Sequence, residues 1–190
     1  MAIEGTDGPD VLIGTAGDDT IKAGAGNDNV VAGDGNDRVV AGAGKDVVEA
    51  GAGNDSANGG GGDDILDGGE GDDRLFGGAG DDIIIGGNGN DVLYGGKPED
   101  KLDTHNNGAD QFWFDDDDGS DKVFGFTTSD VKESLGGTAD RADTVQLTDG
   151  GTYTLEYKNG STILTYGATS VTFYNAILES DYVFGSVHVV

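Results

Sequence analysis

Aspartates that could bind a cation recur at one fixed interval through the first half of the chain. Eleven of them stand nine residues apart, namely Asp10, Asp19, Asp28, Asp37, Asp46, Asp55, Asp64, Asp73, Asp82, Asp91 and Asp100. The chain has no cysteine, and its two histidines, His105 and His188, lie outside this series. Carboxylate and main-chain carbonyl oxygens favour Ca²⁺ over Zn²⁺ or Mg²⁺. The spacing therefore indicates calcium binding, and the alternative is that each Asp only caps its turn through an Asx-type hydrogen bond.

A nine-residue repeat surrounds these aspartates and runs from Gly5 to Asp103, with the pattern small-small-x-Gly-x-Asp-x-apolar-x. One apolar residue in nine is too few for an amphipathic helix, which needs about three in seven. We therefore expect strands of three residues joined by turns of six, two repeats in each coil of a flattened spiral, and odd and even repeats in opposite parallel sheets. Glycine suits such turns because it adopts positive φ and allows close backbone approach.

The repeats spanning residues 68–76 (Gly-Gly-Glu-Gly-Asp-Asp-Arg-Leu-Phe) and 77–85 (Gly-Gly-Ala-Gly-Asp-Asp-Ile-Ile-Ile) resemble the nonapeptide of RTX (repeats-in-toxin) proteins, the hemolysin-type calcium-binding repeat. The resemblance covers residues 5–103. It implies an all-β fold, a right-handed parallel β-roll, in which each Ca²⁺ lies between one turn and the next but one. Repeat positions 2, 4 and 6 of one turn and 1, 3 and 6 of the other would supply the oxygens, with only position 6 using its side chain.

Applied to this chain, the resemblance pairs each aspartate with the one eighteen residues later, from Asp10 with Asp28 to Asp82 with Asp100, and implies about nine ions. The turn carbonyls that it assigns as ligands include those of Gly24, Gly26, Gly33, Gly35, Gly42, Gly44, Gly51, Gly53, Gly60, Gly62, Gly69, Gly71, Gly78 and Gly80. Three repeats depart from the pattern, because Thr6 and Thr15 replace the second glycine and Pro98 replaces the fourth-position glycine. We expect the threonine carbonyls still to serve, the last pair to be the least secure, and Lys45 to lower the local affinity slightly without ligating.

Residues 1–103 are thus expected to form the roll, and residues 104–190 a β-rich, β-sandwich-like C-terminal cap that continues it. Residues 108–114 resemble the segment that follows the roll in serralysin-like secreted proteins. The acidic-then-apolar end of the chain, residues 179–190, resembles an uncleaved type I secretion signal, and its alternative is a final core strand. The run Asp115–Asp118 before Asp121 is either a solvated loop or an extra calcium site outside the roll.

The charge of the chain narrows the possible partners. With 37 Asp and Glu against 10 Lys and Arg, its net charge of −27 disfavours nucleic-acid binding. The sequence has no apolar run long enough to span a membrane and no sign of a cleaved N-terminal signal. We therefore expect export by type I secretion machinery to an extracellular location.

Outward positions of the odd repeats are rich in Val and Ile, so we expect their sheet to pack on the C-terminal region or on a second copy as a homo-oligomer.

Two functions fit these observations. The first is a non-catalytic calcium-binding RTX protein whose roll folds on binding Ca²⁺ after secretion. The alternative is an accessory or adhesive binding module for a polysaccharide or a protein partner. An enzyme is not expected, because the sequence contains no serine nucleophile elbow, no zinc motif and no cysteine nucleophile, and because the repeats begin at Gly5, which leaves no room for a catalytic domain before them.

Overall fold

The computed structural model describes residues 1–97, 99–103, 111–114, 120–124, 144–147, 153–158, 161–166, 169–173 and 183–184. These residues form two sheets. Sheet A contains, in spatial order, β1 (Ala2–Glu4), β3 (Thr20–Ala25), β5 (Arg38–Ala43), β7 (Ser56–Gly61), β9 (Arg74–Ala79), β11 (Val92–Lys97), β13 (Gln111–Phe114), β15 (Thr144–Leu147) and β19 (Val183–Phe184). Sheet B contains β2 (Val11–Ile13), β4 (Asn29–Asp34), β6 (Val47–Ala52), β8 (Ile65–Glu70), β10 (Ile83–Asn88), β12 (Lys101–Asp103), β14 (Ser120–Phe124), β18 (Thr169–Phe173), β17 (Ser161–Tyr166) and β16 (Tyr153–Lys158).

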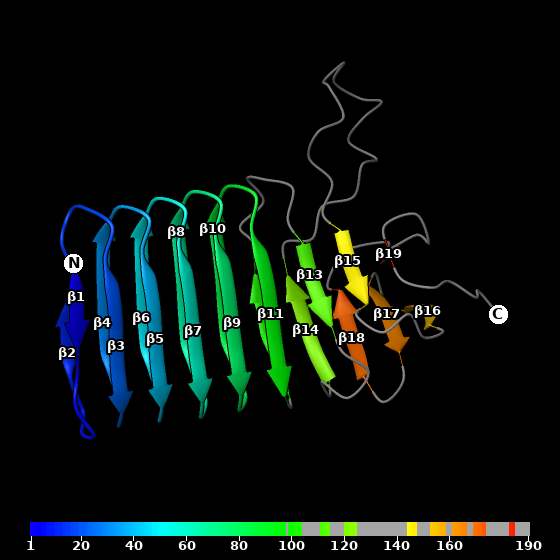
Figure 1. The fold of residues 1–190 in the computed structure, drawn as a ribbon. Coiled ribbons are helices and arrows are strands. Elements are labelled where there is room, and N and C mark those ends of the chain that lie inside the picture. Colours follow the sequence, from blue (N-terminus) through cyan, green and yellow to red (C-terminus); the bar gives the residue numbers. More distant parts are fainter. Residues whose placement is uncertain are drawn as a thin grey trace, which may run out of the picture.

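The two sheets form a parallel β-solenoid, with the chain passing from one sheet to the other in every repeat (Figure 1). Even repeats supply sheet A and odd repeats supply sheet B, as the sequence predicts. Neighbouring strands pair in parallel with a shift of eighteen residues, for example Thr20 with Arg38 and Arg38 with Ser56. One coil therefore consists of two repeats, and the prediction of an all-β parallel roll is confirmed. No helix in the described ranges is long and apolar enough to cross a membrane.

The strands from β3 to β11 are longer than the sequence indicates. Each contains six residues instead of three, because the first three residues of the following repeat extend it. The second-position glycines belong to this extension, and they pair from coil to coil in the same register, as Gly24 does with Gly42. Only repeat positions 4 to 6 are left for the turn. The small residues of the pattern thus pair in the sheet as well as allowing the chain to reverse.

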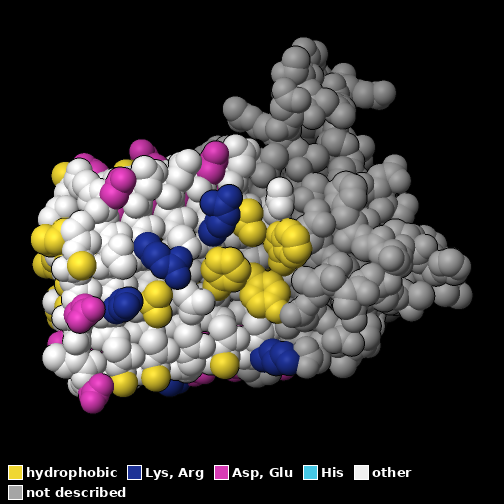
Figure 2. Space-filling model, in the orientation of Figure 1, with side chains coloured by type: hydrophobic (Ala, Val, Ile, Leu, Met, Phe, Trp, Pro, Cys, Tyr) yellow, Lys and Arg dark blue, Asp and Glu magenta, His cyan; other side chains and the backbone are white. Residues whose placement is uncertain are grey.

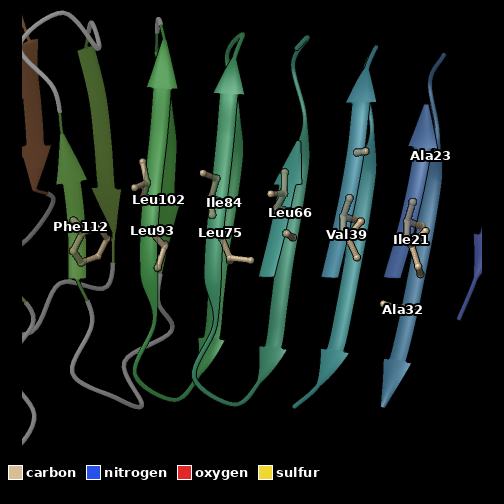
Figure 3. Packing of buried hydrophobic residues seen from close by; sticks show 14 of the residues in the cluster. Ile21, Ala23, Ala32, Val39, Leu66, Leu75, Ile84, Leu93, Leu102 and Phe112 are labelled. Atoms are coloured by element: carbon tan, nitrogen blue, oxygen red, sulfur yellow. The ribbon is translucent and has the colours of Figure 1, made fainter. Parts of the chain in front are cut away.

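The core lies between the sheets, and its larger apolar side chains form one column on each (Figure 3). The residue two after each aspartate points inward, and Ile21, Leu66 and Ile84 are fully buried. Burying each such side chain stabilises the fold by about 1.5–3 kcal/mol. Repeat position 1 also points inward, which the pattern of one apolar residue in nine did not reveal. Alanine at this position is fully buried in four repeats, at Ala23, Ala32, Ala41 and Ala50.

Strands of the C-terminal region extend both sheets. β13, β15 and β19 continue sheet A in parallel, and β14 and β18 continue sheet B. β16 and β17 form the hairpin predicted around residues 158–161 and add to β18 in antiparallel orientation. A domain boundary near residue 103 stays a prediction. Predictions on His105, on residues 115–118, on His188 and on most of residues 179–190 lie outside the described residues.

The outer face of sheet B carries the Val and Ile residues that the sequence singles out. Val11 is 72% exposed and Ile65 is 40% exposed in the single chain. This face is therefore open at Ile65 in the single chain. Packing against a second copy stays a prediction.

Candidate metal sites

The repeat aspartates form two columns along the edges of the roll, one for the odd and one for the even repeats. Ten of the eleven are at most 3% exposed, and only Asp10 is not buried. From Asp10 to Asp82, the main-chain N–H of each aspartate donates to Oδ1 of the aspartate eighteen residues later, at 2.8 Å from Asp28 to Asp46 and 2.8 Å from Asp55 to Asp73. Parallel stacking thus brings together the pairs that the resemblance implies.

The second carboxylate oxygen of most of these aspartates is buried without a hydrogen-bond partner. Within the described residues, this holds for Oδ2 of Asp28, Asp37, Asp46, Asp55, Asp64, Asp73 and Asp82. A buried polar group with no partner typically costs about 1–3 kcal/mol, and a charged one costs more. An Asx-type hydrogen bond satisfies one carboxylate oxygen and leaves the other without a partner. The row of buried Oδ2 atoms without a donor therefore favours a cation over the capping alternative.

Burial raises the pKa of the carboxylates in the middle of both columns. It does so for Asp37, Asp46 and Asp55, and it raises the pKa of Asp64 to about 6 and those of Asp73 and Asp82 to about 7. The hydrogen bond from the neighbouring main chain partly opposes this effect, and nearby carboxylates add to it. Without a cation, Asp64, Asp73 and Asp82 therefore take up protons close to neutral pH.

The glycines at repeat positions 2 and 4 bring main-chain oxygens towards the columns. In repeats 3 to 10, both of these glycines have positive φ, as at Gly60 (110°) near the end of β7 and Gly62 (120°) in the turn. Successive turns stack so closely that a Cβ added to Gly60 would overlap the carbonyl oxygen of Gly42. The N–H of Gly44 donates to the carbonyl oxygen of Gly61 at 2.7 Å, which fixes one turn on the next but one.

Carboxylate and carbonyl oxygens from different turns converge beside the first glycine of the later repeats. A Cβ added to Gly68 would overlap Oδ2 of Asp73 and lie 2.5 Å from the carbonyl oxygen of Gly86. Gly77 has the same surroundings, formed by Asp82 and Gly95. No group of three or more His, Asp or Glu side chains gathers among the described residues. The donor set is therefore a mixture of carboxylate and main-chain oxygens, which suits Ca²⁺.

The first two repeats differ from this arrangement. The hydroxyl of Thr6 donates to Oδ2 of Asp10 at 2.9 Å, and that of Thr15 donates to Oδ2 of Asp19 at 2.8 Å. The amine of Met1 lies 2.5 Å from Oδ1 of Asp19, and together with the Thr15 hydroxyl it lowers the pKa of that carboxyl. Protein groups thus satisfy Oδ2 of both aspartates, and the Met1 amine pairs with Oδ1 of Asp19. Neither turn has the pair of positive-φ glycines found in later repeats, because a β-branched residue disfavours that conformation.

One member of the odd column escaped the sequence analysis. The N–H of Asp100 donates to Oδ1 of Asp121 at 3.0 Å, and Asp121 is 1% exposed. Asp121 therefore continues the column, twenty-one residues after Asp100 instead of eighteen. Gly119 stands two residues before it and Val123 two residues after it, as in the repeats. Three inserted residues moved this signal off the nine-residue period.

Lys45 lies on the outer edge of the turns, away from the buried carboxylates. Its ammonium forms an ion pair with Asp63, and this hydrogen bond raises the pKa of the lysine. Both side chains are exposed.

Comparison with known proteins agrees with the geometry of the repeats. The model of the RTX calcium-binding nonapeptide repeat (4 copies) matches residues 4–39, 40–75 and 67–97. No curated protein matches the chain. Among solved structures, the chain is similar to the extracellular lipase LipA from Serratia marcescens, with 22% identity and a TM-score of 0.46 over 92% of this chain. The similarity spans only 39% of the lipase chain. The repeat match and the stacked turns show that residues 4–97 belong to the family of RTX calcium-binding nonapeptide repeats, and that the chain is an RTX β-roll protein.

Proposed function

We propose that the protein is a non-catalytic calcium-binding RTX protein whose roll folds when Ca²⁺ binds after secretion. The row of buried carboxylate oxygens without partners is the observation that carries this proposal. When bound, Ca²⁺ supplies the positive charge that compensates these carboxylate oxygens. The chain's own part is to hold the carboxylate of one turn next to the carbonyl oxygens of the next but one.

The ligand pairs fall into two groups. Both turns have two positive-φ glycines in six pairs, from Asp28 with Asp46 to Asp73 with Asp91. The pairs of Asp10 with Asp28 and of Asp19 with Asp37 each include a threonine-capped carboxylate, and the last repeat has Pro98 in place of a turn glycine. We assign six strong sites to the first group and up to three weaker sites to the second.

The requirement for Ca²⁺ also supports the proposed place of folding. The chain has a net charge of −27, and the folded columns stack carboxylates in a dry environment. Extracellular calcium sites commonly bind at about 10⁻⁴–10⁻³ M, which is far above the cytosolic Ca²⁺ level. The chain would therefore stay extended inside the cell and fold after export. Secretion through type I machinery, suggested by residues 179–190, is part of the same proposal.

Circular dichroism in chelator and in millimolar Ca²⁺ tests this account. We expect a coil spectrum in chelator and a β spectrum with Ca²⁺, because metal binding and folding share one free energy. Millimolar Mg²⁺ is the control, and it should not induce the β spectrum because it demands a stricter octahedral geometry. A chain that is fully folded in chelator at neutral pH would contradict the proposal.

Calcium binding should weaken as the pH falls through the raised pKa values. Asp64, Asp73 and Asp82 have pKa values of about 6 to 7 in the ion-free roll, and about 3.8 is the ordinary value. Lowering the pH from 8 to 5 therefore protonates these ligands, which favours the ion-free fold and competes with Ca²⁺. In chelator, circular dichroism should therefore show more β-structure at pH 5 than at pH 8, while the Ca²⁺ bound at a fixed Ca²⁺ concentration, measured by equilibrium dialysis, should fall below about pH 7. Bound Ca²⁺ that stays constant from pH 8 to 5 would exclude buried carboxylates as the ligands.

A further inference from the structure

The outer face of sheet A differs in composition from the rest of this acidic molecule. The strands β3, β5, β7, β9, β11 and β13 contain no Asp or Glu, and they hold four of the ten Lys and Arg of the chain. The corresponding strands of sheet B, from β4 to β14, hold six Asp and Glu, of which Asp121 is buried, and two Lys. Figure 2 shows basic side chains beside a hydrophobic group, with acidic side chains towards the edges. The local charge therefore favours an anionic ligand at sheet A over sheet B.

Three aromatic side chains stand in a row on this face. The strand register places Phe76 on β9 next to Tyr94 on β11, and Tyr94 next to Trp113 on β13. The rings of Phe76 and Tyr94 have centroids 6.3 Å apart and are tilted by 52°. Trp113 is 36% exposed, and the other two rings are partly exposed. Because strands lie about 4.8 Å apart, the row follows the axis of the roll and offers one ring on each strand.

Basic side chains continue this surface towards the N-terminal end. Arg38 on β5 and Arg74 on β9 belong to one outward row, separated by Ser56 on β7, and Lys22 on β3 lies in the same row as the aromatic residues. Lys22, Arg38 and Arg74 are exposed, and none of the three forms an ion pair with a described residue. Unpaired guanidinium groups are thus available in a protein with 37 acidic residues.

The combination points to a ligand with flat apolar faces and regularly spaced carboxylates. Sugar rings stack on aromatic side chains through their C–H faces, and guanidinium groups bind carboxylates with two parallel hydrogen bonds. The strand spacing is close to the length of one sugar ring. The two arginines lie two strands apart, which suits a chain that bears a carboxylate on every second sugar.

We propose that the outer face of sheet A, from Lys22 to Trp113, binds an acidic polysaccharide containing uronate sugars and lying along the axis of the roll. Phe76, Tyr94 and Trp113 stack on its sugar rings, and Arg38 and Arg74 bind its carboxylates. Single-stranded nucleic acid also combines stacking with phosphate contacts. It bears a phosphate on every nucleotide, so its affinity depends on neutralising many charges. The six strands offer only four Lys and Arg, which suits a ligand with more widely spaced charges.

Isothermal titration calorimetry in millimolar Ca²⁺ tests the proposal, with hyaluronan octasaccharide as the acidic probe. A cello-oligosaccharide of similar length is the neutral probe, and a short single-stranded DNA is the third. We expect measurable binding of the acidic probe that weakens with added salt. Arg74→Ala and Trp113→Ala should each reduce its affinity roughly tenfold or more, since a charged hydrogen bond or a stacked ring is lost.

Lys101→Ala is the matched control, because Lys101 is an exposed cation on β12 of the opposite sheet. It should leave the affinity for the acidic probe unchanged. Circular dichroism of every variant in Ca²⁺ separates a loss of binding from a loss of folding, and hence this proposal from that of calcium-driven folding. Equal binding of the neutral probe, tighter binding of DNA, or no binding by a folded chain would each overturn the proposal.

Discussion

Replacing Asp73 by asparagine is expected to raise the Ca²⁺ concentration needed for folding. Asp73 lies in the middle of its column and is 1% exposed, and it would serve the ions on both sides. Asparagine can still accept the N–H of Asp55 through Oδ1, where the bond is now 2.8 Å. Its amide NH₂, however, would replace the negative oxygen beside the carbonyl of Gly86. We expect a loss of at least about 1–3 kcal/mol in Ca²⁺, the usual cost of an unsatisfied buried group.

Asp72→Asn is the matched control, because it makes the same charge change one residue away. Asp72 is exposed, and its Oδ1 accepts the N–H of Asn90 at 2.9 Å. An asparagine oxygen can accept the same bond, as Asn36 does from Asn54. Calcium titrations followed by circular dichroism should therefore shift for D73N and not for D72N. Equal shifts would mean that overall charge, and not coordination, determines folding.

The effect of D73N should change sign when Ca²⁺ is removed. At pH 8 the carboxylate of Asp73 is charged even with its pKa raised to about 7, and burial disfavours that charge. A neutral amide removes this penalty. In chelator, with an osmolyte added to favour the compact chain, D73N should populate the β spectrum more than the wild type does. The opposite order would indicate that the carboxylate does not lie buried in the ion-free roll.

Replacing Gly60 by alanine is expected to prevent the turns from stacking. Gly60 has a φ of 110°, and an added Cβ would overlap the carbonyl oxygen of Gly42 in the coil before. The backbone conformation alone costs a non-glycine residue about 1–3 kcal/mol. The overlap adds to this cost, and it also pushes away a carbonyl assigned to a calcium site. Thermal unfolding in saturating Ca²⁺ should show a clearly lower Tm for G60A, with a higher calcium midpoint.

The adjacent residue in β7 provides the control. Gly61 has no atom within 4 Å of an added Cβ and does not have positive φ. Alanine already stands at this position in other repeats, as at Ala43 and Ala79. G61A should leave the Tm unchanged or stabilise the roll by about 0.4–1 kcal/mol, because it restricts the unfolded chain. If G60A and G61A behave alike, the close contact between stacked turns does not limit stability.

Much of the roll could be predicted from the sequence because the same residues, and therefore the same interactions, recur from repeat to repeat. Nearly every repeat has a glycine, an aspartate and an inward apolar residue at the same spacing. Few folds can bury an apolar residue that recurs once in nine positions, and each further repeat supports the same prediction. The hairpin of β16 and β17 was also local enough to predict, since Asn159 and Gly160 form a turn signal between alternating strands. The prediction was wrong on strand length, because pairing of Gly24 with Gly42 depends on the neighbouring coil.

The sequence by itself determined which carboxylates line up, because a period of nine and a coil of eighteen place equivalent aspartates in register. Only the tertiary structure decided which of those carboxylate oxygens have no hydrogen-bond partner. The satisfied Oδ2 of Asp10 and the unsatisfied Oδ2 of Asp73 belong to the same repeat position. The structure also decided that Asp121 joins the column and that Phe76, Tyr94 and Trp113 meet on one face. These contacts depend on register between strands distant in sequence, and an inserted loop changes the period without changing the stacking.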